Sequence, residues 1–384
     1  MSIEEEVSAA LCRCGLRTRL HRAKASAAGE ILHGLLPVGR AALVTEERTD
    51  NALAETVRIA LRAYRPCCVV LGEKDSFMPL FALPDDVRAV VAIGNRALLA
   101  ARFFRTLRGG FALLLPVRPS ADGLFDSAAP APWDGYPLDE PDAVLADGDI
   151  LQGGRDARAD VALSALCAEE LEVDGLFTET PHDARGLRRA ADIAAGSDAA
   201  SPDGREDVLF ASVLACLEKR AFPAFGCEAV ARRAPGGSGA VLAYFARRYA
   251  ALFAHGRPRP FFVPDYAARA ARAAARLGMP PASLFANVRV PTGEQSFDLG
   301  VRFAEVRQRL CTSAELLVRF ADRILQPKRA GEHADGAGGG DALAEHPLAA
   351  WYDLSAECSP LLSAPALERE FGLLENPAPV QPAP

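Results

Sequence analysis

Five short runs of apolar residues divide the first part of the chain. They are Ala41 to Thr45 (AALVT), Cys67 to Leu71 (CCVVL), Val87 to Ile93 (VRAVVAI), Phe111 to Leu115 (FALLL) and Ala143 to Ala146 (AVLA). Strands that are apolar on both faces are typical of parallel sheets covered by helices on both sides. The runs therefore predict buried strands of one parallel sheet.

A helix with one apolar face is expected between the first two runs. The side chains that recur there at helical spacing are Leu53, Val57, Ala60, Leu61 and Tyr64. Candidate capping residues precede the helix at positions 49–51, and Pro66 follows it. Strand and helix therefore alternate, which predicts an α/β fold with a doubly wound parallel sheet and a ligand crevice at the carboxyl ends of its strands.

Beyond about residue 155 the pattern changes to one helix after another. Apolar residues have helical spacing at Val161 to Leu171, Glu206 to Leu217, Val241 to Phe253, Tyr266 to Leu277 and Leu299 to Leu310. The sequence therefore predicts two domains. A nucleotide-type domain is expected over residues 1–155 and an all-helical domain over residues 156–329.

The composition changes again from residue 330 onward. The segment AGEHADGAGGGDALAEHP is rich in glycine and polar residues, and the last residues are NPAPVQPAP. A stretch of this kind has no core of its own. Residues 330–384 are therefore expected to form a linker and C-terminal tail that the two domains do not need for folding.

Half of the 384 residues are apolar, enough for a sizeable core, and the formal net charge is -7. No basic run is long enough to follow a phosphate backbone, which argues against a nucleic-acid partner. No apolar stretch reaches the length of a bilayer span, and the acidic start MSIEEE lacks the basic region of a secretory signal. We therefore expect a cytoplasmic protein with no membrane partner, whose nine cysteines are reduced.

The loop after the third apolar run is the first candidate for binding chemistry. Gly94 follows this run and leads into a helix through Asn95 and Arg96. A glycine turn at a helix N-terminus lets backbone amides approach a pyrophosphate. Arg96 either adds positive charge for a phosphate or fills the space that a nucleotide needs. The alternative for Gly94 is that it only turns the chain.

A hydroxyl and a carboxylate follow the fourth apolar run. Ser120 and Asp122 are expected at the carboxyl end of a strand, where they suit a nicotinamide amide or a polyol hydroxyl. The alternative for Asp122 and Gly123 is an ordinary Asp-Gly turn. The residues alone leave both interpretations open.

Three segments resemble, in order and spacing, the sn-glycerol-1-phosphate dehydrogenase family of the dehydroquinate synthase and iron-containing alcohol dehydrogenase superfamily. That family has a G-x-G-T-x-x-D pattern after its third strand and then a T-A-P-S-M-D-G stretch. The corresponding segments here are GNRALLA, from Gly94, and VRPSADG, which keeps the Pro-Ser and Asp-Gly pairs. DAVLADGDIL, which contains Asp147, is similar to the segment that leads into the family's helical domain.

The resemblance implies a dehydroquinate synthase-like fold and NAD(P)-dependent oxidation of a polyol phosphate, such as glycerol 1-phosphate, by a homo-oligomer. It assigns Gly94, Arg96 and Ser120 to the cofactor and makes Asp122 and Glu169 the catalytic candidates. It also implies a divalent metal, usually zinc, that polarises the substrate hydroxyl. Glu169 and His255 match two of the three metal ligands. The candidate residues of both domains are expected around one crevice.

Several positions depart from the family pattern. Ala240 and Tyr244 stand where the E-H-x-x-S-H motif has its histidines. In the G-x-G-T-x-x-D cofactor motif, Arg96 replaces the second glycine and Ala100 replaces the aspartate. A catalytic zinc site uses three protein ligands, and two remain here. Two hypotheses follow. The chain is either a polyol-phosphate dehydrogenase with altered ligands or a non-catalytic relative that binds a small ligand or another subunit.

Overall fold

The computed structural model describes residues 2–72, 77–125, 137–178, 183–221, 231, 237–255, 261–262, 271–272, 274–276, 296–297, 308, 315 and 318–321. The chain divides into two compact units. The first consists of Met1–Gly154 and Ser197–Leu217, and the second of Arg155–Gly196 and Glu218–Pro384. The sequence analysis assigned residues 197–217 to the helical domain, whereas in the structure they group with the first unit.

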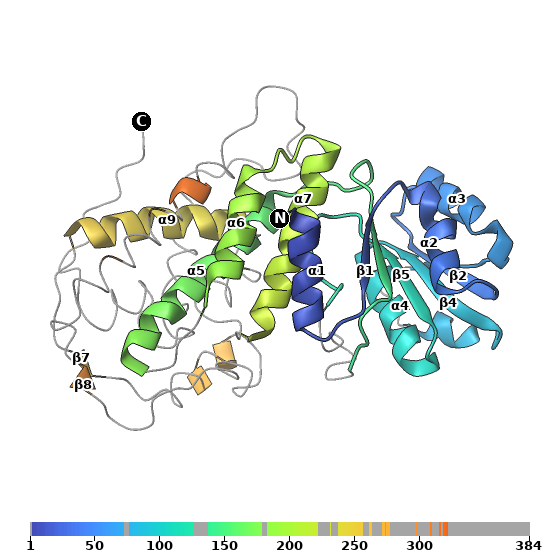
Figure 1. The fold of residues 1–384 in the computed structure, drawn as a ribbon, viewed down its shortest axis with the longest axis horizontal. Coiled ribbons are helices and arrows are strands. Elements are labelled where there is room, and N and C mark those ends of the chain that lie inside the picture. Colours follow the sequence, from blue (N-terminus) through green and yellow to red (C-terminus); the bar gives the residue numbers. More distant parts are fainter. Residues whose placement is uncertain are drawn as a thin grey trace. The chain divides into compact units, whose positions relative to one another are not determined.

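The first unit is built on a six-stranded sheet (Figure 1). The strand order is β1-β6-β5-β4-β2-β3. All five strand pairings are parallel. The five apolar runs are all strands of this sheet, so the predicted α/β fold with a doubly wound parallel sheet is confirmed. The strands are β1 (Arg19–Arg22), β2 (Arg40–Glu46), β3 (Cys67–Leu71), β4 (Val87–Ile93), β5 (Phe111–Leu115) and β6 (Ala143–Ala146).

Helices cover both faces of the sheet, with α2 and α3 on one face and α4 on the other (Figure 1). The expected helix after the first apolar run is α3, and Asp50 caps it by accepting a hydrogen bond from the amide of Ala52 at 2.7 Å. The helices of this unit are α1 (Ile3–Arg13), α2 (Ala28–Leu35), α3 (Asn51–Ala60), α4 (Asn95–Arg108) and α7 (Pro202–Glu218). The short 3-10 helices are η1 (Ala25–Ala27), η2 (Arg62–Tyr64) and η3 (Met78–Ala82).

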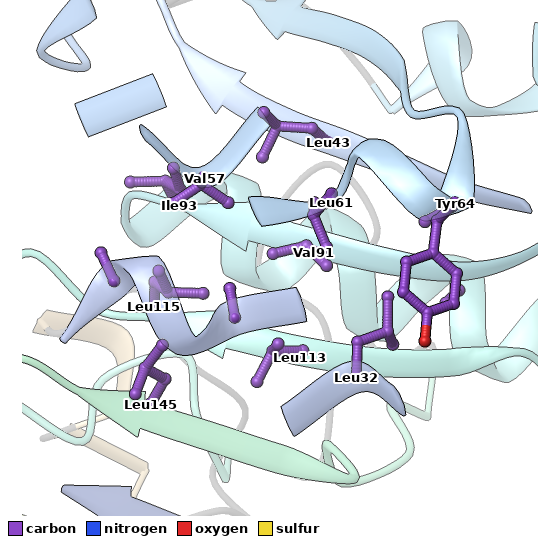
Figure 2. Close-up of a cluster of buried hydrophobic side chains, with 14 of the residues drawn as sticks. Leu32, Leu43, Val57, Leu61, Tyr64, Val91, Ile93, Leu113, Leu115 and Leu145 are labelled. Carbon is purple, nitrogen blue, oxygen red and sulfur yellow. The ribbon is translucent and has the colours of Figure 1, made fainter. Parts of the chain in front are cut away.

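The core of this unit lies between α2, α3 and the sheet. Alternate residues of β2, β4 and β5 point into it, among them Leu43, Val91 and Leu113 (Figure 2). Leu32 of α2 and Val57 of α3 pack against them and are fully buried. Since each buried aliphatic side chain contributes roughly 1.5 to 3 kcal/mol, this cluster holds the two helices on the sheet.

Strand β3 differs from its prediction in burial. Leu71 is buried, but Cys68 is exposed and Val70 retains 58% of its accessible surface. The expectation that this run is buried on both faces is wrong, because β3 is the outermost strand of the sheet and has β2 on one side alone.

Strand β1, at the other edge, was not predicted because its residues RLHR form no apolar run. It pairs in parallel with β6 from Arg19 to Arg22. The guanidinium of Arg22 contacts the carboxylates of Glu4 at 2.7 Å, Asp207 at 2.8 Å and Glu206 at 3.3 Å. These ion pairs link β1 to α1 and α7, and they explain why α7 groups with the first unit.

The described part of the second unit is mainly helical, as predicted. Its helices are α5 (Arg155–Thr178), α6 (Arg185–Gly196), α9 (Gly237–His255) and the 3-10 helix η4 (Lys219–Ala221). Two short strands, β7 (Phe261–Phe262) and β8 (Ser296–Phe297), pair antiparallel and were not expected in an all-helical domain. The helices predicted at residues 266–277 and 299–310 lie largely outside the described residues, and so does the tail from residue 330. Among the residues that the structure describes, no helix is long and apolar enough to cross a bilayer.

Candidate functional site

The turn between β4 and α4 lies at the carboxyl edge of the parallel sheet, where α/β folds bind ligands. Gly94 forms this turn as the N-cap of α4, with φ 103° and ψ 153°, a backbone conformation that essentially requires glycine. Its amide donates to the carbonyl of Leu115 at 3.4 Å. Gly94 therefore does turn the chain, and its role toward a cofactor stays a prediction.

The carboxylate of Glu46 sits at the start of α4. Its Oε1 accepts hydrogen bonds from the backbone amide of Arg96 at 2.6 Å and from that of Ala97 at 3.2 Å. The first amides of a helix have no partner within the helix, and the helix dipole favours negative charge beside them. The carboxylate of Glu46 accepts from these amides and supplies the negative charge. A side chain of the protein itself therefore occupies the position that suits a bound anion.

Strand register brings Glu46 to this position. Val44 of β2 pairs with Ala92 of β4, and two further residues along each strand lead to Glu46 and Gly94. The backbone of Glu46 is held by Thr49, whose Oγ1 accepts from the Glu46 amide and whose amide donates to the Glu46 carbonyl, each at 2.9 Å. The sequence analysis missed Glu46. A charged residue directly after an apolar run was the available signal, but its partner across the sheet was not visible.

Ser120 and Asp122 form a local turn after β5. The amide of Asp122 donates to Oγ of Ser120 at 3.2 Å, and Gly123 has a φ of +78°. The amide of Ala121 donates to Oγ of Ser212 in α7 at 2.9 Å. The Asp-Gly turn is thus present and is anchored within the first unit, while the side chain of Asp122 is exposed.

A buried arginine of α4 also holds this turn. Arg102 of α4 is fully buried and donates from Nη1 to the carbonyl of Gly123 at 2.8 Å. Its Nε donates to the carbonyl of Asp139 at 2.9 Å. A buried guanidinium needs such acceptors, and here it ties two loops at this edge of the sheet to α4.

Glu169, the metal and catalytic candidate, lies in the interior of the second unit. Its side chain is 7% exposed, and Oε1 accepts a hydrogen bond from Nε of Arg188 in α6. The hydrogen bond to Glu169 raises the pKa of Arg188. Nη2 of the same guanidinium lies 3.5 Å from Oε2 of Glu172. The carboxylate of Glu169 is therefore engaged in an ion-pair network between α5 and α6.

Asp160 is a candidate that the sequence analysis missed. Asp160 is five residues after Arg155, the first residue of α5, whereas Glu169 is fourteen residues after it. The carboxylate of Asp160 accepts a hydrogen bond from Oγ of Ser238 in the first turn of α9. The sequence pattern placed the start of this helix at Val161, so Asp160 was not recognised as a helix residue.

Helix α9 carries the remaining metal-site positions. Ala240 and Tyr244, which the resemblance aligns with histidines, lie in its first half, and His255 is its last residue. The side chain of His255 lies outside the described part of the chain. Within the described part, no group of three or more His, Cys, Asp and Glu side chains is arranged to hold a metal ion.

The candidate residues are divided between the two units. Gly94, Arg96, Ser120 and Asp122 belong to the first, and Glu169 and His255 belong to the second. That they surround one crevice stays a prediction.

No protein-family model matches this sequence, and no curated protein matches it. Solved structures do match. An iron-containing alcohol dehydrogenase from Thermococcus thioreducens has a TM-score of 0.50 at 11% identity, over 91% of this chain and 95% of that one. A probable glycerol dehydrogenase from Sinorhizobium meliloti has a TM-score of 0.44 at 14% identity, over 80% and 95%. Maleylacetate reductase from Agrobacterium tumefaciens has a TM-score of 0.47 at 14% identity, over 92% and 96%. The chain therefore has the dehydroquinate synthase-like fold of the iron-containing alcohol dehydrogenases.

Proposed function

We propose that this chain is a non-catalytic relative of the metal- and nicotinamide-dependent polyol dehydrogenases, which keeps their fold without their redox activity. The observation that carries the proposal is the position of Glu46. The resemblance implies that the turn after β4 offers its helix N-terminus to a dinucleotide pyrophosphate, and here the carboxylate of Glu46 already accepts from those amides.

A dinucleotide pyrophosphate does not fit beside Glu46. The phosphate oxygens and the carboxylate need the same two amide donors, those of Arg96 and Ala97. Two negative charges about 4 Å apart also repel each other by ~4 kcal/mol at an effective dielectric constant near 20. NAD(P), which the fold implies, would have to displace the Glu46 carboxylate from these two amides.

The metal-ligand candidates of the second unit support the same proposal. The carboxylate of Glu169 is paired with Arg188, and that of Asp160 accepts from Ser238. Ala240 and Tyr244 supply no imidazole. A carboxylate that is neutralised by a guanidinium is a poor ligand for zinc, which requires about three protein ligands for a catalytic site.

The role that remains for the protein is binding. Ser120 and Asp122 offer a hydroxyl and a carboxylate at the carboxyl edge of the sheet, and both groups suit the hydroxyls of a small polyol without a phosphate. We expect such a ligand, or a second copy of the chain, rather than sn-glycerol 1-phosphate, because Glu46 disfavours phosphorylated compounds at this edge of the sheet.

The direct test uses the purified full-length chain. We expect no saturable binding of NAD or NADP by calorimetry, less than one equivalent of zinc or iron, and no nicotinamide reduction with glycerol or glycerol 1-phosphate after metal is added. Saturable, metal-dependent reduction of NAD(P) with either polyol would show an active dehydrogenase with altered ligands and would refute the proposal.

A further inference from the structure

We propose that the carboxylate of Glu46 acts as an internal anion at the turn between β4 and α4. The turn otherwise keeps the geometry of a phosphate-binding turn, so removal of this carboxylate should let a free anion bind there. The inference rests on the proposed function, because it names the group that keeps nucleotide phosphates away from the N-terminus of α4.

The backbone of the turn keeps the geometry that anion binding requires. Helix α4 runs over 14 residues, and its amides at Arg96 and Ala97 converge on one oxygen atom of Glu46. Amides that converge in this way at a helix N-terminus make an anion-binding concavity. What differs from a ligand site is that the anion belongs to the protein.

Glycine at position 94 leaves the space in which this carboxylate lies. A Cβ atom built on Gly94 would lie 2.6 Å from Oε1 of Glu46 and 2.8 Å from its carboxyl carbon. The room that a glycine gives to a phosphate in a nucleotide-binding turn is thus taken by Glu46. Glu46 and Gly94 therefore form a matched pair across β2 and β4.

The backbone of Glu46 is anchored, which keeps its carboxylate within reach of α4. Its amide and carbonyl are both bonded to Thr49, and the next amide, of Glu47, donates to the carbonyl of Leu71 in β3 at 3.2 Å. With the strand end fixed on two sides, a free anion competes against a carboxylate at very high effective concentration. The wild-type chain should therefore reject phosphates that a comparable empty turn would bind.

The experiment measures binding of inorganic pyrophosphate by calorimetry to the full-length wild-type chain and to three variants. Glu46→Ala removes the carboxylate, and Glu46→Gln removes its charge but leaves an oxygen for the two amides. Glu47→Ala is the matched control, because it removes a neighbouring exposed carboxylate that the structure does not place at α4.

We expect Glu46→Ala to bind pyrophosphate at least tenfold more tightly than the wild type and the Glu47→Ala control, and Glu46→Gln to gain less. The gain should weaken as salt is raised, since it is electrostatic. Thermal melting and amide spectra establish whether each variant is folded. If Glu46→Ala does not fold, the isosteric Glu46→Gln decides the question.

Equal pyrophosphate affinity in all four proteins would overturn the inference. So would wild-type binding as tight as that of Glu46→Ala. Either result in a wild-type chain without dehydrogenase activity would leave the proposed function standing. NAD(P)-dependent activity of the wild type would instead refute the proposed function itself, so the two failures are distinguishable.

Discussion

At the scale of single residues, Gly94 of the turn before α4 is coupled to Glu46 at the end of β2. The φ of 103° at Gly94 is a conformation that other residues rarely adopt, and the space beside its Cα is filled by the Glu46 carboxylate. Either feature alone selects glycine. Together they make position 94 sensitive both to the backbone and to its partner across the sheet.

Gly94→Ala should lower the free energy of unfolding by about 3 kcal/mol, because it adds backbone strain and a clash with Glu46. The matched control is Gly109→Ala at the other end of α4. Gly109 also has a positive φ, 65°, but no atom lies within 4 Å of the Cβ it would gain. Gly109→Ala should lower the free energy of unfolding by about 1 kcal/mol.

Urea denaturation measures both costs. If the clash with the carboxylate contributes, Glu46→Ala in the Gly94→Ala background should recover part of the loss, and a double-mutant cycle gives the coupling. Equal losses for the two glycine variants, with no recovery, would mean that Glu46 does not lie beside Gly94.

At the scale of secondary-structure elements, helices α5 and α6 are joined by one guanidinium. Arg188 of α6 contacts Glu169 and Glu172 of α5, and Oε1 of Glu172 also accepts from the amide of Ala184 at the start of α6 at 2.7 Å. Two carboxylates on one helix face would repel each other without this cation. Arg188 is the cation that both carboxylates share.

Arg188→Met should destabilise the chain by about 2 to 3 kcal/mol, because it leaves Glu169 buried without its cation. Arg185→Met is the control. Arg185 is in the same helix and pairs with Asp183, but its side chain is 82% exposed, so its loss should cost less than ~1 kcal/mol.

Thermal melting with and without zinc separates the two roles of Glu169. If Glu169 serves only the ion pair, zinc should not restore the stability of Arg188→Met. A rise in melting temperature that requires both zinc and Glu169 would identify this carboxylate as a metal ligand and favour the dehydrogenase hypothesis.

At the scale of the whole molecule, the chain passes between its two units more than once. It leaves the first unit after Gly154, returns at Ser197 and leaves again after Leu217. Within the first unit, α7 is tied to β1 by the ion pairs of Arg22 and to the β6 loop by Glu206, which accepts from the amide of Gly148 at 2.6 Å. A domain defined by a single cut at residue 155 would lack this helix.

Removal of the chain after residue 330 should leave the melting temperature nearly unchanged. The Gly-rich segment that begins there has no apolar pattern with which to join a core. Circular dichroism melting of the shortened and full-length chains measures this. A shortened chain that is insoluble, or that melts much earlier, would mean that the tail belongs to the folded body or to an interface.

Much of the fold was predictable because local pattern and burial agree. The runs AALVT, VRAVVAI, FALLL and AVLA are apolar because both faces of these strands are covered, and Asp50 caps α3 through a contact two residues away. In contrast, RLHR is a strand because its backbone pairs with β6, while α1 and α7 supply carboxylates for Arg22.

By itself, the sequence determined the α/β class, the parallel strands, the change to helices and the departures from a dehydrogenase motif. Each of these depends on the pattern of residues that are close together in the sequence. Only the tertiary structure decided that Glu46 reaches the amides of α4 and that Arg188 neutralises Glu169. The partners are 50 and 19 residues apart in sequence. Strand register and helix packing bring them together, and no local pattern carries that information.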